Sequence, residues 1–286
     1  MASIDNPTPH VIPEGQNATP LEVVGASASD KLIIIMVGLP GSGKTFMAKR
    51  ICRYISFFHD IPSQIFNVGD YRRELCGVQL PASFYDPNNA DGMASRNKAC
   101  EAAQNDLVEF MKQDGVRLAI YDATNNTVEN RAKILKRLED ENIGAKKMFV
   151  ESVVNDTKML EENVRTVKLS TPDYKGVAPD KALQDFMMRR ENYNKSYTEV
   201  EDSEGSYVRV MNYQKFVVYN VRGYLPLKVS LICARFSNIL VLVLVVCSYL
   251  GYTVIVSHGN ATNRAPHHLP SAICRLNQCP LSPTTL

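Results

Sequence analysis

Apolar residues gather into short runs along this chain, and the runs alternate with longer segments of helical periodicity. Four of the runs are rich in β-branched or aromatic residues and stop at a glycine or a polar residue, as buried strands do. These runs are KLIIIMVG (31–38), SQIFNVG (63–69), VRLAIYDATN (116–125) and KKMFVESV (146–153). Residues 207–221 predict either a closing pair of strands or a strand followed by the start of a helix.

The segments between these runs predict helices. Residues 45–58 put Met47, Ile51, Ile55 and Phe58 on one helical face, and residues 93–115 and 129–144 each end at a glycine. YRREL after the second strand opens polar sequence, and residues 155–200 are mostly helical and highly charged. Strands that alternate with helices predict an α/β fold of the P-loop NTPase type, with a doubly wound, mainly parallel sheet and helices on both faces.

Residues 38–45, GLPGSGKT, match the phosphate-binding loop GxxxxGK[ST] in full. A strand precedes the loop and a helix follows it, which is the context that this motif requires. Its glycines let backbone N–H groups approach the phosphates, while Lys44 would bridge the β- and γ-phosphates and the Thr45 hydroxyl would bind Mg²⁺. Asp122, at the end of the third strand, is the candidate for a second magnesium ligand, and its alternative role is that of a turn or helix cap.

Charge and composition narrow the class of protein. The chain has 32 Lys and Arg against 30 Asp and Glu, so it lacks the strong positive net charge that would attract nucleic acid. None of its seven cysteines forms a CxxC pair, which favours reduced thiols and a cytoplasmic protein. The base-reading NKxD motif of GTPases is missing, because neither Asn-Lys pair, at 97–98 or at 194–195, is followed by the aspartate.

Arginines and lysines follow successive strands, where the ligands of a doubly wound sheet bind. Arg is suited to holding a phosphate through paired hydrogen bonds, so this set predicts a second anionic substrate beside ATP. The set comprises Arg72, Arg73, Arg96, Lys168, Arg189 and Arg190.

Six motifs in order resemble the kinase domain of the 6-phosphofructo-2-kinase/fructose-2,6-bisphosphatase family over roughly residues 31–228. They are IMVGLPGSGKT, FNVGDYRRE, YDATNNT, FVESVVND, NVRTVKLSTPDYK and FVVYNVRGYL. The resemblance implies transfer of the ATP γ-phosphate to the 2-hydroxyl of fructose 6-phosphate. No bisphosphatase activity is expected, because SHGN (257–260) lacks the family's Arg-His-Gly pattern.

The resemblance also implies roles for individual residues. Lys44 and Asp122 would be catalytic, and Thr45 and Asp122 would hold Mg²⁺. ATP would contact Gly38, Leu39, Pro40, Gly41, Ser42, Gly43, Lys44, Thr45, Asn163 and Lys168. Fructose 6-phosphate would contact Arg72, Arg96, Thr124, Lys168, Arg189 and Tyr193.

The sequence departs from the family's pattern at two positions. Val154 replaces a cysteine, and Asn130 stands where the family has an arginine that binds the sugar phosphate. Arg131, beside Asn130, would bind the sugar phosphate in its place if the helix turned slightly; otherwise weaker sugar binding is expected.

Two other functions stay open: a P-loop kinase of another small metabolite or of a polynucleotide end, and a weakened regulatory protein that binds ATP and sugar phosphate. A homodimer also stays open.

Both ends of the chain differ from the rest. Residues 1–30 predict a flexible leader. Residues 229–286 form an atypical tail in which 236–256 carry no charge over 21 residues, about the length that crosses a bilayer. The tail has three interpretations: a membrane anchor with a cytoplasmic kinase, a hydrophobic packing helix, against which the 21 uncharged residues argue, and translated intron sequence. We favour the last, since Lys-Val-Ser at 228–230 is encoded by a common 5′ splice site.

Overall fold

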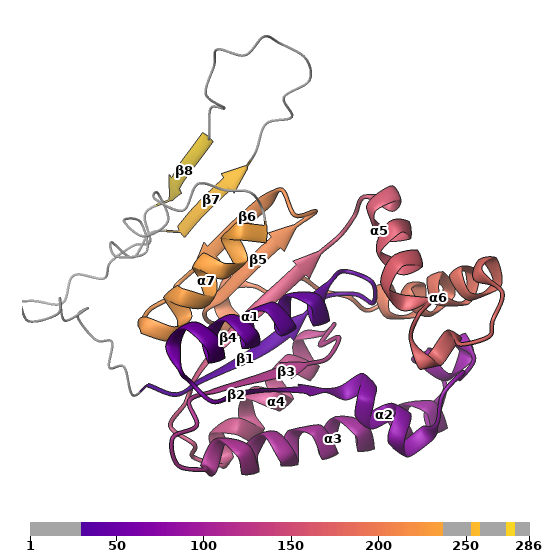
Figure 1. The fold of residues 1–286 in the computed structure, drawn as a ribbon, viewed down its shortest axis with the longest axis horizontal. Helices are drawn as coiled ribbons and strands as arrows, with labels where there is room; N and C mark the ends of the chain where they lie inside the picture. The colour runs from indigo at the N-terminus through magenta and orange to yellow at the C-terminus, as the bar shows by residue number, and fades with distance from the viewer. Residues whose placement is uncertain (1–29, 237–252, 258–272, 278–286) are drawn as a thin grey trace, which may run out of the picture.

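The computed structural model describes residues 30–236, 253–257 and 273–277. These residues form an α/β fold around one eight-stranded sheet with the order β2-β3-β1-β4-β5-β6-β7-β8 (Figure 1). The five strands from β2 to β5 are parallel, and the remaining strands are antiparallel to their neighbours. The prediction of a doubly wound, mainly parallel sheet is therefore confirmed.

The strands are β1 (Leu32–Val37), β2 (Ser63–Asn67), β3 (Leu118–Asp122), β4 (Lys146–Val153), β5 (Tyr207–Met211), β6 (Lys215–Tyr219), β7 (Thr253–Ser257) and β8 (Ile273–Asn277). The α-helices are α1 (Lys44–His59), α2 (Val68–Cys76), α3 (Ala90–Lys112), α4 (Val128–Asp140), α5 (Thr157–Asn163), α6 (Pro179–Asn194) and α7 (Tyr224–Phe236). Shorter helical turns are η1 (Ala82–Tyr85), η2 (Val164–Lys168), η3 (Pro172–Tyr174) and η4 (Asp202–Glu204).

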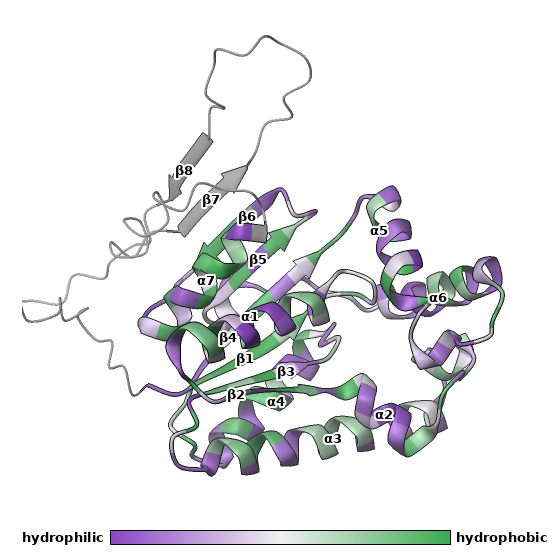
Figure 2. Ribbon diagram, in the orientation of Figure 1, coloured by the Kyte–Doolittle hydropathy of each residue, from purple (hydrophilic) through white to green (hydrophobic). Residues whose placement is uncertain are grey.

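Strand β1 is buried along its whole length, and its side chains divide between two cores. Ile34 and Met36 pack with α1 and α7 on one face of the sheet, while Ile33 and Ile35 pack with α3 and α4 on the other. This division follows from the strand period of two, which sends successive side chains to opposite faces. Figure 2 shows the apolar centre of the sheet between the more polar helices.

A third, smaller core lies beyond the carboxyl ends of the strands, under α5 and α6 (Figure 1). Leu160, Val164, Tyr174 and Phe186 form most of it, and Val154 is 2% exposed among them. A valine suits this apolar surrounding. This core holds α5, η2 and α6 beside the phosphate-binding loop, where a Cβ on Gly41 would lie 2.9 Å from Leu160.

Two local predictions need correction or completion. The YRREL segment belongs to helix α2 and does not form a polar loop. The Asn67 side chain caps this helix by accepting a hydrogen bond from the backbone N–H of Asp70 at 3.2 Å. Residues 207–221 form the strand pair rather than a strand and a helix, with β5 and β6 antiparallel.

The predicted boundary at residue 228 falls inside α7, which continues to Phe236. Val229 and Cys233 are completely buried in the core of the α1 face. No helix within the described ranges is both long and apolar enough to cross a membrane. Residues 1–29 and 237–252 lie outside the described residues, and 253–257 form β7, so the leader and the origin of the tail stay predictions.

Candidate active site

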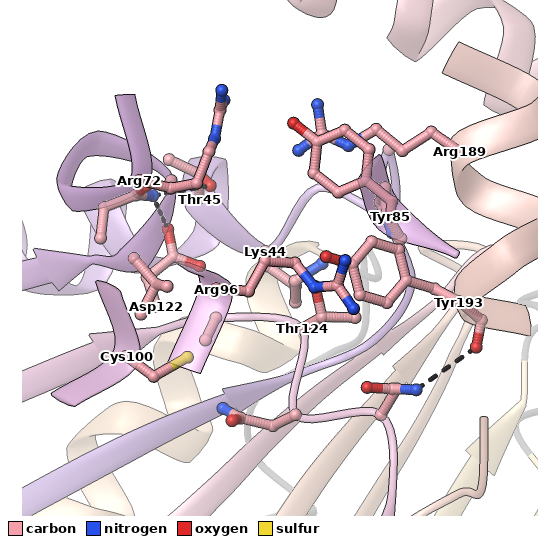
Figure 3. Close-up of a pocket in the computed structure, with 18 of the residues that line it drawn as sticks. Lys44, Thr45, Arg72, Tyr85, Arg96, Cys100, Asp122, Thr124, Arg189 and Tyr193 are labelled. Atoms are coloured by element: carbon pink, nitrogen blue, oxygen red, sulfur yellow. Dashed lines mark hydrogen bonds between the residues drawn. The ribbon is translucent and has the colours of Figure 1, made fainter. Parts of the chain in front are cut away.

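A cavity of about 1420 Å³ opens at the carboxyl ends of β1, β2 and β3 (Figure 3). The phosphate-binding loop and the end of β3 line one part of it, and α2, η3 and α6 meet in the far part. Residues of η2, α3 and α4 complete the lining. Pockets for a single small molecule usually measure roughly 300–1,000 Å³. The cavity is therefore large enough for two substrates side by side.

The loop between β1 and α1 requires glycine at two positions. Gly38 and Gly43 have φ angles of 137° and 88°, which side chains rarely adopt. A Cβ atom on Gly38 would lie 2.3 Å from the carbonyl oxygen of Ser152, and one on Gly43 would lie 2.0 Å from the Tyr213 hydroxyl. The loop thus has the close backbone packing that a phosphate cradle needs.

Lys44 lies in the first turn of α1 and is 8% exposed. Its Nζ donates a hydrogen bond to the carbonyl oxygen of Leu39 at 2.8 Å. Burial lowers the pKa of Lys44 to about 7; the charge of Asp122 opposes this shift, and the charge of Lys168 adds to it. Burial likewise lowers the pKa of Lys168. Two buried ammonium groups that are poorly stabilised as cations would gain from a bound anion such as a phosphate.

Thr45 and Asp122 come together through Asn67, a residue that the sequence analysis missed. Asn67 lies opposite Asp122 in the β2–β3 pairing, and its Nδ2 is 2.5 Å from Oδ2 of Asp122 and 3.4 Å from Oγ1 of Thr45. A hydroxyl and a carboxylate are hard oxygen donors that fit Mg²⁺, which usually takes only one or two protein carboxylates. Within the described residues no cluster of three or more His, Cys, Asp or Glu could hold a metal alone, so phosphate oxygens would complete the coordination.

The far part of the cavity gathers arginines around Asp173, which the sequence analysis also missed. Arg72 Nη2 donates to both carboxylate oxygens of Asp173 at 2.8 and 2.6 Å. Arg73 Nη1 lies 3.2 Å and Arg189 Nη1 3.8 Å from the same carboxylate. Burial alone would raise the pKa of Asp173, but the hydrogen bond and charge of Arg72, with the other arginines, bring that pKa below its ordinary value. The carboxylate therefore stays ionised and holds the arginines together.

Arg189 retains the capacity to bind an anion. Its guanidinium stacks 3.7 Å from the centre of the Tyr85 ring, and its buried Nε has no hydrogen-bond partner among the described residues. A buried donor without a partner is costly unless a ligand satisfies it. Tyr85 is a further site residue that no motif in the sequence had indicated.

Most of the predicted site residues line the cavity. Those that do are Pro40, Gly41, Gly43, Lys44, Thr45, Arg72, Arg96, Asp122, Thr124, Asn163, Lys168, Arg189 and Tyr193. Gly38, Leu39 and Ser42 belong to the loop but lie behind its cavity-facing surface, so they would shape the loop instead of lining the cavity.

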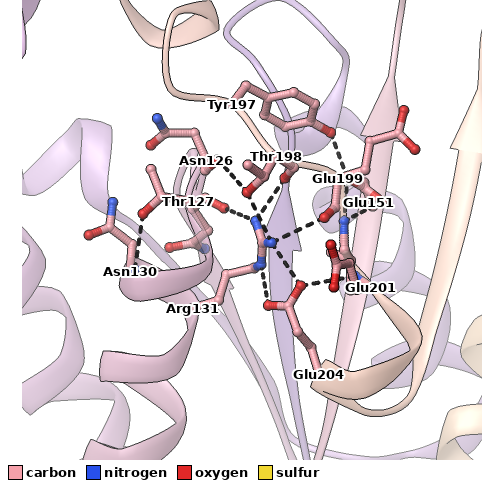
Figure 4. Close-up of polar contacts among 12 residues, drawn as sticks. Asn126, Thr127, Asn130, Arg131, Glu151, Tyr197, Thr198, Glu199, Glu201 and Glu204 are labelled. Carbon is pink, nitrogen blue, oxygen red and sulfur yellow. Dashed lines mark hydrogen bonds and ion pairs between the residues drawn. The ribbon is translucent and has the colours of Figure 1, made fainter.

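The structure contradicts the placement of Arg131 as a sugar-phosphate ligand. Arg131 is completely buried, and its guanidinium bonds to Glu204 and to backbone carbonyls, away from the cavity (Figure 4). Its neighbour Asn130 is the one that lines the cavity. Arg190 is likewise turned away, because it donates to the carbonyl oxygens of Pro40 and Val154 and so braces the phosphate-binding loop.

Comparison with known proteins places this site in a family. The family model of 6-phosphofructo-2-kinase matches residues 22–234. The rat "6-phosphofructo-2-kinase/fructose-2,6-bisphosphatase 4" is 37% identical over 201 residues, covering 69% of this chain and 42% of the relative. The Caenorhabditis elegans "6-phosphofructo-2-kinase/fructose-2,6-bisphosphatase" is 36% identical over 207 residues, covering 69% and 45%.

A yeast relative, the "6-phosphofructo-2-kinase 1" of Saccharomyces cerevisiae, is 34% identical over 204 residues, covering 69% of this chain and 24% of its own. The chain thus matches less than half the length of these three relatives. The family model covers most of the described fold, including the phosphate-binding loop, Asp122 and the arginine cluster. The chain therefore belongs to the 6-phosphofructo-2-kinase family.

Proposed function

We propose that this chain transfers the γ-phosphoryl group of ATP to the 2-hydroxyl of fructose 6-phosphate and so makes fructose 2,6-bisphosphate. The observation that carries the proposal is one cavity with a phosphate-binding loop in one part and the Arg72–Asp173–Arg189 cluster in the other. Such a cavity suits two phosphorylated substrates laid side by side. The names of the relatives point to the same reaction.

ATP would lie on the phosphate-binding loop, with its β- and γ-phosphates at the backbone N–H groups and at Lys44. Thr45 and Asp122 would hold Mg²⁺, which when bound neutralises charge on the phosphates. Asn163 reaches this part of the cavity too, and its Nδ2 lies 3.4 Å from the carbonyl oxygen of Gly41. These groups would position the γ-phosphorus and stabilise charge on its oxygens.

The 6-phosphate of the sugar would bind the arginines at Asp173, where Arg189 has a free buried donor. The sugar's 2-hydroxyl oxygen would then attack the γ-phosphorus, the bond to the β–γ bridging oxygen would break, and the hydroxyl proton would leave to solvent. The hydroxyl is anomeric and so more acidic than an ordinary alcohol. No general base is assigned for that reason.

The test uses the full chain with Mg-ATP and fructose 6-phosphate, and it assays an acid-labile bisphosphate together with ADP. Glucose 6-phosphate is the control acceptor, because it carries the same phosphate but no 2-ketose hydroxyl. Equal amounts of ADP and fructose 2,6-bisphosphate support the proposal. Turnover with another metabolite or a polynucleotide 5′-end, or tight ATP binding without any transfer, contradicts it.

Asn130→Arg is expected to lower the KM for fructose 6-phosphate about tenfold, since a charge-assisted hydrogen bond contributes roughly 1.5–3 kcal/mol. Asn130 and Lys133 both line the cavity from α4. A longer cation at position 130 would reach the acceptor there. Steady-state kinetics at saturating ATP measure the change.

Ala132→Arg is the matched control for Asn130→Arg, because Ala132 is exposed on the same helix and does not line the cavity. It adds the same charge without adding a contact. An unchanged KM in Asn130→Arg, or an equal fall in both variants, would argue against a role for position 130 in binding.

A further inference from the structure

A buried polar network lies behind the acceptor part of the cavity, with Arg131 at its centre (Figure 4). The Nε and Nη2 of Arg131 donate to the two carboxylate oxygens of Glu204 at 2.6 and 2.8 Å. The same guanidinium donates to the backbone carbonyls of Asn125, Thr198 and Glu199 at 3.1, 2.9 and 3.2 Å. All donors that the guanidinium offers are therefore directed at protein groups.

The network joins two segments that are far apart in the sequence. One is the 123–127 loop after β3, and the other is the 196–204 segment after α6. Asn126 Nδ2 donates to Ser196 Oγ at 2.7 Å, and the backbone N–H of Thr198 donates to the Asn126 carbonyl at 2.8 Å. Arg131 crosses this junction from α4, so its ion pair with Glu204 ties three elements together.

The 123–127 loop and the end of α6, which leads into the 196–204 segment, carry groups that face the cavity. Thr124 lines the cavity, and its carbonyl accepts a hydrogen bond from the backbone N–H of Gly38 at 3.0 Å. Tyr193 also lines the cavity, and its carbonyl lies 3.4 Å from Nδ2 of Asn126. The placement of these two side chains therefore depends on how the loop and the 196–204 segment sit against each other.

A second ion pair extends the network and explains its rigidity. Glu151 on β4 is completely buried, pairs with Arg209, and accepts from the Tyr197 hydroxyl at 2.5 Å. Glu151 also accepts from the backbone N–H of Val200 at 3.2 Å. Loss of one partner of a buried pair leaves an uncompensated charge, so such networks permit few alternative arrangements.

We infer that Arg131, acting through Glu204, is a positioning residue that fixes Thr124 and Tyr193 for the acceptor substrate. It does not touch the substrate. This inference rests on the proposed function, because it concerns the binding of fructose 6-phosphate in particular. The ATP part of the cavity also has contacts outside this network, namely those of Arg190 with the phosphate-binding loop and the glycine packing described above, and it meets the network at the bond from Gly38 to Thr124.

The test compares Arg131→Lys and Glu204→Gln with the wild type in the full chain. Lysine keeps the charge but cannot make the paired bonds to Glu204, and glutamine keeps the shape of Glu204 without its charge. Both variants are expected to raise the KM for fructose 6-phosphate about tenfold or more, because small misplacements near a reacting group have effects of this size. The KM for ATP is expected to change less than twofold. Arg137→Lys, the same substitution at a half-exposed position of α4 whose guanidinium contacts Asn105 and Glu141 instead of the network, is the control.

Thermal unfolding separates positioning from a general loss of fold. Variants that unfold at nearly the wild-type temperature and show the selective rise in KM support the inference. Should Arg131→Lys not fold, Glu204→Gln decides, since it leaves the arginine in place. Folded variants with unchanged KM values, or with equal rises for both substrates, overturn it. A wild type that makes no product overturns the proposed function itself, which distinguishes the two failures.

Discussion

Replacing Lys44 with methionine is expected to lower kcat about 10³-fold, with little effect on folding. Lys44 is the cation of the phosphate-binding loop, and methionine has a similar length without the charge. Removal of a single preorganised group that stabilises transition-state charge typically lowers kcat by about 10²–10³-fold, and here the group also orients the phosphates. Initial rates of fructose 2,6-bisphosphate formation at saturating substrates measure the effect.

The fold of Lys44→Met should remain intact because Lys44 is buried with a pKa lowered to about 7, so the folded chain gains little from this charge. Its unfolding temperature is expected to match or exceed that of the wild type. Lys136→Met, on the exposed face of α4, is the control and should keep full activity. A Lys44→Met protein that turns over at more than a tenth of the wild-type rate would contradict the assigned role of the loop.

The core of the fold could be predicted because its signals are local. β1, the loop and α1 follow one another within 28 residues, from Leu32 to His59, and each has a strong pattern of its own. Helix α2 was missed since it has few apolar positions and depends on a cap from Asn67. Helix α7 runs past the predicted boundary at residue 228, because the burial of Val229 and Cys233 against α1 cannot be read from their neighbours in the sequence.

The site was predictable as a region but not side chain by side chain. The rule that ligands bind at the carboxyl ends of parallel strands brought Arg72, Asp122 and Arg189 together correctly. It could not separate Arg189 from Arg190, or Asn130 from Arg131, because adjacent residues on a helix point about 100° apart. In each pair one residue lines the cavity and the other is directed into the protein. Which residue of a pair lines the cavity depends on the rotation of the helix about its own axis when it packs against the rest of the protein.

Asp173 and Asn67 show what a sequence pattern lacks. Asp173 stands 101 positions from Arg72, yet the two are joined by paired hydrogen bonds in the structure. Asn67 meets Asp122 only because β2 pairs with β3 in a register that sets them opposite each other. Both contacts are products of the tertiary structure, although a polar residue at the end of a predicted strand was an available hint for Asn67.

Asp122→Asn is expected to lower kcat about 10²-fold to 10³-fold, through a changed response to Mg²⁺. Asp122 is 3% exposed and accepts a hydrogen bond from Asn67 at 2.5 Å, which aims its carboxylate toward Thr45. Asparagine keeps the size of the side chain and removes the charge that attracts the metal. The Mg²⁺ concentration for half-maximal activity should therefore rise about tenfold or more.

ATP binding without the metal distinguishes this role from a structural one. The Asp122 carboxylate repels the phosphates when no Mg²⁺ lies between them, so in EDTA the Asp122→Asn protein should bind ATP as tightly as the wild type or more tightly. With Mg²⁺ the order should reverse, because only the wild type has a negatively charged oxygen at position 122 to attract the metal. Asp114→Asn, at an exposed position after α3, should behave as wild type in both conditions. Weaker ATP binding in EDTA would mean that Asp122 holds the loop together, whereas lost activity with an unchanged Mg²⁺ response would place Asp122 at the acceptor hydroxyl instead of the metal.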